Sequence, residues 1–196
     1  MERGLDSVYE MAQKIDINRR TEAAALVTQA GSALDYCHSH QLGFCDVSPS
    51  NILQRQPGNY FITDTETVIW GLSQDGSLMI WDFAAPEIIE TNRQLRLHTI
   101  SYYSWEIFRL ADQHALAAAA YWLLTKNGGQ DLYLDDNLQT FPNHIYDNVC
   151  LAPDALLSPA TYRVLLKATS FNPADRYPSC TAFAQALRPT LVAGNL

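Results

Sequence analysis

Basic residues are scarce in this chain of 196 residues, which carries 13 lysines and arginines against 21 aspartates and glutamates. The formal net charge is −8. A surface of that sign gains nothing from releasing counterions around phosphates or from facing anionic lipid headgroups. We therefore expect no nucleic acid among the partners and no general attachment to an anionic membrane surface.

Cysteines and long apolar runs are also scarce. The four cysteines show no CxxC pairing; they are Cys37, Cys45, Cys150 and Cys180. No apolar run is long enough to span a bilayer, and no secretory leader is apparent. We therefore expect a cytoplasmic protein with reduced thiols, which act as buried packing groups rather than as ligands.

The remaining composition is that of an ordinary soluble globular protein, with 47% hydrophobic and 17% charged residues. A chain of this length can bury one sizeable core. The sequence thus predicts a single domain over residues 1–196.

A tight hairpin is the clearest local prediction. Residues 51–54 and 59–63 are short β-prone runs, and Pro57-Gly58 between them is a turn signal. Such a hairpin places the start of its first strand opposite the end of its second. We therefore expect Asn51 and Asp64 to lie close together.

Three oxygen-bearing side chains mark the region 34–66, namely Asp46, Asn51 and Asp64. A carboxylate and an amide oxygen that meet suit a hard cation such as Mg²⁺, whose other ligands are typically phosphates and water. The alternative is that Asp46 and Asn51 only cap turns around Pro49, as these residue types often do.

The run from Cys45 to Leu53 resembles the catalytic loop of eukaryotic-type (bacterial Ser/Thr) protein kinases, in which an Asp is followed five positions later by an Asn. Asp64 is similar to the metal-binding Asp of the family's DFG motif. The resemblance implies that Asp46 is catalytic and that Ser48, Asn51 and Asp64 meet the nucleotide phosphates. It also implies that Asn51 and Asp64 hold the Mg²⁺ that accompanies ATP.

Two later motifs extend the resemblance. Ala85-Pro86-Glu87 is similar to the APE motif that closes the family's activation segment, here the region 64–87. The run from Phe171 to Leu187 is close to the ending of bacterial Ser/Thr kinases. The resemblance implies that Arg176 forms a buried, bidentate ion pair with Glu87.

The strongly apolar run over residues 112–126 predicts a helix buried nearly all round. Asp112 stands where the family's helix-opening Asp bonds to the catalytic-loop backbone. Residues 90–110 before it form a longer connection than the family normally has, for which local packing is a better explanation than partner binding.

The fold class implied by these matches is mainly α with short β-hairpins, namely the large C-terminal lobe of a protein kinase without its N-terminal β lobe. His38 and His40, at the end of an expected helix, are predicted to cap or pack rather than to bind metal, because they lack the rest of a zinc set. The expected helices cover residues 5–14, 21–39, 112–126 and, within the C-terminal region 159–189, residues 159–169 and 181–187. A second hairpin is expected over 67–81.

Several positions depart from the kinase pattern. Phe44 and Cys45 stand at the His-Arg positions, Ser48 replaces a Lys, and Thr65-Glu66 replace Phe-Gly. We expect a kinase-like protein, which binds Mg²⁺ and ATP and transfers a phosphoryl group to a protein hydroxyl slowly or with a partner's help. The alternatives are a catalytically inactive pseudokinase that acts as a protein-binding or regulatory scaffold, and a fragment of a longer kinase. In each case we expect another protein chain or lobe to cover the interlobe face.

Overall fold

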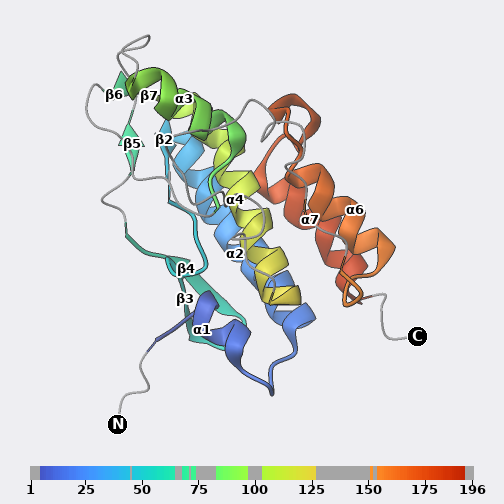
Figure 1. The fold of residues 1–196 in the computed structure, drawn as a ribbon. Helices are drawn as coiled ribbons and strands as arrows, with labels where there is room; N and C mark the ends of the chain where they lie inside the picture. The colour runs from blue at the N-terminus through green and yellow to red at the C-terminus, as the bar shows by residue number, and fades with distance from the viewer. Residues whose placement is uncertain are drawn as a thin grey trace.

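The computed structural model describes residues 5–44, 46–64, 68–70, 72–73, 83–96, 103–126, 151 and 154–192. The fold within these ranges is mostly helical with small antiparallel sheets (Figure 1). The helices are α1 (Val8–Gln13), α2 (Arg19–Ser39), α3 (Pro86–Arg96), α4 (Trp105–Thr125), α6 (Pro159–Ala168) and α7 (Cys180–Val192), with a 3₁₀ turn at Pro173–Asp175. The strands are β1 (Asp6–Ser7), β2 (Leu42–Gly43), β3 (Ile52–Gln56), β4 (Asn59–Ile62), β5 (Ile69–Trp70), β6 (Leu72–Ser73) and β7 (Tyr103–Ser104).

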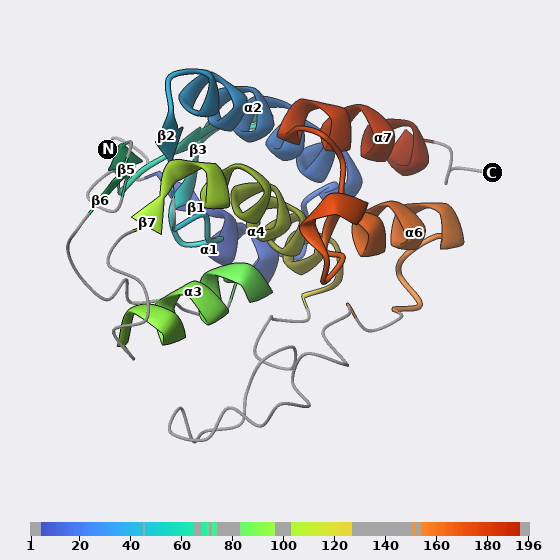
Figure 2. The same ribbon diagram turned by 90° about the horizontal axis from the view of Figure 1, so that it is seen from above.

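Helix α4 lies at the centre of the molecule. Helix α2 packs along one side of it and α3 covers the opposite side, while α6 and α7 lie beside α2 and α4 (Figure 2). Every residue from Ala111 to Tyr121 is buried, and alanine side chains allow the neighbouring elements to approach closely. The predicted burial of this helix all round is therefore confirmed.

The start of α4 corrects the sequence prediction. The helix begins at Trp105 rather than at Asp112, and residues 90–96 belong to α3. Most of the supposed connection over 90–110 is therefore helical, and residues 97–102 lie outside the described residues. Phe108 is fully buried one turn before Asp112, so the apolar stripe of α4 continues towards its N-terminus.

The hairpin of β3 and β4 confirms the prediction for residues 51–63. Ile52 lies opposite Ile62, and Gly58 in the turn has a φ of 71°, which favours glycine. The strand β1 adds to the outer side of β3, so that residues 5–7, predicted as helix, are extended. Helix α1 begins only after Ser7, whose side chain forms a capping box with Glu10.

The second predicted hairpin is not seen in the described residues. Strand β5 pairs with β2, which follows α2 directly, and β6 pairs with β7, which precedes α4. Residues 77–81, the predicted partner strand, lie outside the described residues. Within the described residues, the segment after the first hairpin is thus joined to distant parts of the chain.

The C-terminal helices match their predicted positions closely. Helix α6 ends one residue before the expected position, and α7 extends five residues beyond it. Helix α7 packs closely on α2, where a Cβ on Gly31 would lie 3.2 Å from the carbonyl oxygen of Cys180. None of the helices in the described ranges combines the length and apolar character needed to cross a membrane.

Candidate functional site

The loop between β2 and β3 carries Asp46 and is held by the core on both sides. Phe44 and Val47, which flank it, are buried. The N–H of Phe44 donates to Oδ2 of Asp112 at 2.8 Å, and the N–H of Tyr9 donates to the carbonyl of Pro49 at 3.0 Å. Helices α4 and α1 therefore fix the backbone of this loop at its two ends.

Asn51 is directed back onto Asp46. Its Nδ2 donates to the carboxylate Oδ2 of Asp46 at 2.8 Å and to the Asp46 carbonyl at 3.1 Å. The N–H of Asn51 also donates to the carbonyl of Ser48, which closes a turn. Nδ2 is thus occupied by Asp46, and within the described part of the chain no hydrogen bond is assigned to Oδ1 of Asn51, which can therefore take a ligand.

The hairpin brings the third side chain to the same end. Beyond the Ile52–Ile62 pair, Thr63 donates its N–H and its hydroxyl to the carbonyl of Asn51, at 2.8 and 3.2 Å. Asp64 follows directly and is exposed. Its φ of 60° lies in the left-handed region, which Asp tolerates better than most residues. The hairpin thus brings Thr63, the neighbour of Asp64, against Asn51, whereas the predicted meeting of the Asn51 and Asp64 side chains stays a prediction.

The charge of Asp64 acts on the carboxylate of Asp46. Burial raises the pKa of Asp46 above its ordinary value, the hydrogen bond from Asn51 opposes that rise, and the charge of Asp64 adds to it. A second negative charge near Asp46 is costly unless a cation offsets it. A cation bound beside the two carboxylates would offset this repulsion.

Helix α2 positions the hairpin through a polar network that the sequence reasoning missed. The carboxylate of Glu22 accepts hydrogen bonds from the Tyr60 hydroxyl at 2.5 Å, from Gln54 at 2.8 Å and from the N–H of Gly58 at 3.1 Å. Gln29 on the same helix accepts from the N–H of Tyr60. Glu22 and Gln29 lie two turns apart on one face of α2. No local sequence pattern connects them to Tyr60 in β4, which lies 38 and 31 residues later in the chain.

Asp112 joins the loop to the end of α2. Its Oδ2 accepts from the N–H of Phe44, and it also lies 2.8 Å from Nε2 of His38. Burial disfavours the charged form of His38, but the hydrogen bond to Asp112 and the negative charges of Asp112 and Asp35 outweigh it and raise the pKa of His38 to about 9. Asp112 is thus inside α4, not at its start, and contacts the loop backbone as the resemblance implied.

Glu87 and Arg176 form a bidentate pair that ties α3 to the segment before α7. Nη1 and Nη2 of Arg176 donate to the two carboxylate oxygens of Glu87 at 2.5 and 2.8 Å. The guanidinium also donates to the carbonyls of Ser170 and Leu110. The Arg176 side chain is fully buried and that of Glu87 is 19% exposed.

Ser48 is half-buried beside Asp46 and contributes its carbonyl to the turn that ends at Asn51. Its side chain carries no charge, so this loop places no cation at that position. Cys45, Thr65 and Glu66, the other departures from the kinase pattern apart from Phe44, lie outside the described residues.

Comparison with known proteins gives a distant relationship. No family model matches the chain. The chain is 31% identical, over 183 aligned residues, to serine/threonine-protein kinase PknF of Mycobacterium tuberculosis and of Mycobacterium bovis. The chain is kinase-like. The alignment covers 85% of this chain and 34% of each relative, so the chain spans about a third of the length of the curated relatives it matches.

The donor set of this kinase-like chain fits Mg²⁺. Oδ1 of Asn51 and the carboxylate of Asp64 are hard oxygen donors at the same end of one hairpin. The Asp64 side chain is exposed, so a ligand can reach its carboxylate from solvent. Mg²⁺ keeps several of its waters and takes one or two carboxylates, so this small set is sufficient.

Proposed function

We propose that this kinase-like chain binds Mg²⁺ and ATP and transfers the γ-phosphoryl group to a protein hydroxyl, slowly or only with the help of a partner. The observation that carries the proposal is the arrangement of Asp46, Asn51 and Asp64. The Asn51 amide nitrogen is bonded to Asp46, and its oxygen is left free beside the strand end that bears Asp64.

Each side chain has a distinct role in the proposed reaction. Asp46 orients the substrate hydroxyl and takes its proton, while the hydroxyl oxygen bonds to the γ-phosphorus and the bond to the leaving ADP breaks. The raised pKa of Asp46 makes it a better proton acceptor than an ordinary aspartate. Asn51 and Asp64 would hold Mg²⁺, which neutralises phosphate charge when bound.

The uncharged Ser48 explains why the reaction is expected to be slow. A fixed cation near the transferring phosphoryl group contributes on the order of 3–4 kcal/mol to transition-state stabilisation, by analogy with other electrostatic groups. Its loss corresponds to a rate about 10²–10³-fold lower. A second cation of the kinase family, the Lys that holds the α- and β-phosphates, has no counterpart among the residues of this chain that match the family.

The nucleotide therefore needs a second surface. We infer that another protein chain or lobe covers the adenine side of the site and supplies the missing cation. This cover is either a separate subunit or a further part of a longer kinase. A monodisperse monomer that binds Mg²⁺-ATP tightly on its own would contradict this part of the proposal.

Calorimetric titration with Mg²⁺-ATP tests the proposed site directly. Asp64→Asn keeps the shape of the side chain and removes the charge, so binding should weaken at least tenfold, which is about 1.4 kcal/mol. Asp16→Asn makes the same chemical change at an exposed residue between α1 and α2 and should leave binding unchanged. Equal affinity of wild type and Asp64→Asn would refute the assignment of Asp64.

A second candidate is a catalytically inactive pseudokinase that serves as a protein-binding or regulatory scaffold. The uncharged Ser48 supports it, because a scaffold has no need of a cation at the transferring phosphate. The same titration separates the two candidates. If neither wild type nor Asp64→Asn binds Mg²⁺-ATP, alone or with a partner present, the scaffold is the better account.

A further inference from the structure

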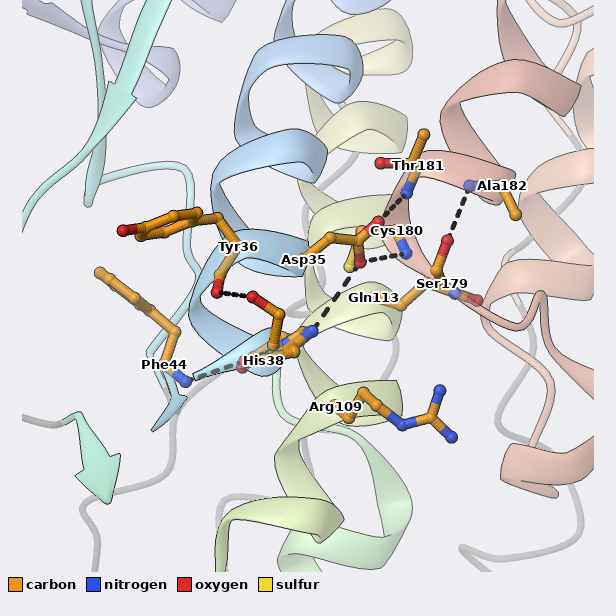
Figure 3. Close-up of polar contacts among 12 residues, drawn as sticks. Asp35, Tyr36, His38, Phe44, Arg109, Gln113, Ser179, Cys180, Thr181 and Ala182 are labelled. Carbon is orange, nitrogen blue, oxygen red and sulfur yellow. Dashed lines mark hydrogen bonds and ion pairs between the residues drawn. The ribbon is translucent and has the colours of Figure 1, made fainter. Parts of the chain in front are cut away.

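A second group of potential ligands lies away from the proposed phosphate site, where α2 meets the start of α7. Asp35 and His38, one turn apart on α2, face Cys180, the first residue of α7 (Figure 3). One carboxylate oxygen, one imidazole nitrogen and the thiol sulfur lie within 4.8 Å of one another. Three different donor types thus converge on one point.

The packing of the two helices accounts for this convergence. Gly31 lies one turn before Asp35, and a side chain there would press on the backbone of Cys180. The Asp35 carboxylate accepts hydrogen bonds from the N–H groups of Cys180 and Thr181, at 3.0 and 2.8 Å. The close approach at Gly31 and the capping by Asp35 together fix the first turn of α7 against α2.

The ring of His38 supplies an independent sign of a ligand. Its Nε2 is held by Asp112, as described above, so the ring is fixed in orientation. Its Nδ1 is buried and, within the described part of the chain, makes no hydrogen bond. The side chain is only 5% exposed, and Nδ1 lies 3.9 Å from Oδ1 of Asp35. Nδ1 therefore lies within ion-pair range of Asp35 but beyond hydrogen-bond distance, and an ion bound between the two atoms would give each a direct partner.

The geometry points to a zinc site formed by Nδ1 of His38, Sγ of Cys180 and a carboxylate oxygen of Asp35. Bond lengths to Zn²⁺ of about 2.0–2.3 Å place tetrahedral ligand atoms about 3.3–3.8 Å apart. The three atoms lie within 4.8 Å of one another, so a bound ion would draw them closer together. Asp112 does not contact the metal but accepts the N–H at Nε2 of His38, because a zinc-bound histidine usually donates its other ring N–H to a carboxylate. Water completes the four ligands.

The chemistry of the set selects zinc over magnesium. Thiolate and imidazole are soft or borderline donors, whereas Mg²⁺ requires oxygen. On binding, Zn²⁺ displaces the proton of the Cys180 thiol and the proton on Nδ1 of His38, and both protons pass to solvent. The thiolate and the Asp35 carboxylate then offset the two charges of the metal.

Asp35 is the most exposed member of this group. The Asp35 side chain is 24% exposed, whereas Cys180 is fully buried, so the open side of the group lies at Asp35. The hydrogen bonds from α7 use one lone pair on each Asp35 oxygen and leave others for the metal. The competing account is a metal-free ion pair in which His38 keeps both protons between Asp35 and Asp112.

Cobalt substitution distinguishes the two accounts, because Co²⁺ bound to a thiolate shows a charge-transfer band in the near ultraviolet. The chain is stripped with a chelator and titrated with Co²⁺ alone, then with Zn²⁺ alone as competitor. We expect wild type to bind one Co²⁺ with this band and to lose it when Zn²⁺ is added. Cys180→Ala should lose the band. Cys37→Ala, at the other free cysteine of the described residues, should retain it.

Absence of the band in wild type, or its retention in Cys180→Ala, would overturn the zinc site. If Cys180→Ala does not fold, X-ray absorption at the zinc edge of loaded wild type decides. A shell with one sulfur at about 2.3 Å and nitrogen or oxygen at about 2.0–2.2 Å supports the site. A shell of oxygen and nitrogen alone contradicts it.

Discussion

Replacing Arg176 with methionine removes the cation that joins α3 to the segment before α7. Arg176 is fully buried and donates to both carboxylate oxygens of Glu87 and to the carbonyls of Ser170 and Leu110. Methionine fills a similar volume without donors. The variant therefore leaves the Glu87 charge and the carbonyls of Ser170, Leu110 and Phe171 without these hydrogen bonds.

The expected cost follows from the burial of this pair. Removing one partner of a buried ion pair destabilises a protein by about 3–5 kcal/mol, and the 19% exposure of Glu87 places this case near the lower end. For a chain of this size, 3 kcal/mol corresponds to a fall in Tm of about 6–12 °C. Glu87→Gln should cost less, because its amide oxygen still accepts from the guanidinium.

Urea unfolding followed by circular dichroism measures these differences, with Arg176→Met, Glu87→Leu and the double variant compared in one cycle. We expect the double variant to be more stable than the sum of the single losses predicts, because it leaves no unpaired charge. An Arg176→Met variant within 1 kcal/mol of wild type, or losses that simply add, would show that the pair does not hold these segments together.

Three further predictions concern stability. Tyr60→Phe removes the hydrogen bond to the Glu22 carboxylate and should lower the free energy of unfolding by about 1.5–3 kcal/mol in urea; no change would mean that the network does not hold the hairpin. The pKa of His114 is lowered from 6.5 to about 3, mainly by burial and to a smaller extent by the positive charge of Arg176. As the pH falls, the unfolded state therefore takes up a proton on His114 before the folded state does, so the free energy of unfolding declines between pH 6.5 and 3. His114→Leu should show a shallower decline in urea unfolding over this range. Equal slopes for wild type and variant would contradict the prediction. Gly43→Ala would place a Cβ too close to Cβ of Phe108 and should lower the free energy of unfolding by about 1–3 kcal/mol, measured by thermal unfolding. A variant as stable as wild type would contradict the close packing.

The parts of the fold that were predicted correctly are encoded locally. The hairpin of β3 and β4 depends on a Pro57-Gly58 turn between two short runs, and the burial of α4 depends on a continuous apolar stretch. The pairing of β5 with β2 was not predicted, because it joins segments far apart in the chain with only two residues on each side. Short strands of this kind are specified by their tertiary neighbours rather than by their own composition.

The candidate site and the proposed zinc group also differ in how far the local sequence could indicate them. Asp46 and Asn51 are five residues apart in one loop, so their contact is a local feature that the motif spacing could indicate. The group of Asp35, His38 and Cys180 joins residues 145 positions apart, and no local pattern connects them. The prediction that His38 packs rather than binds metal considered only donors near it in the sequence, whereas the zinc site proposed above takes its thiol from Cys180 on a different helix.

The location of the metal that accompanies the nucleotide tests the central claim most directly. Crystals of the chain grown with Mn²⁺ and ADP, and with any partner needed for binding, give an anomalous signal at the manganese position. The proposed function predicts a manganese ion bonded to Oδ1 of Asn51 and to the Asp64 carboxylate, with the remaining ligands from phosphate and water. A manganese ion held elsewhere, or nucleotide bound without contact to either residue, would contradict it.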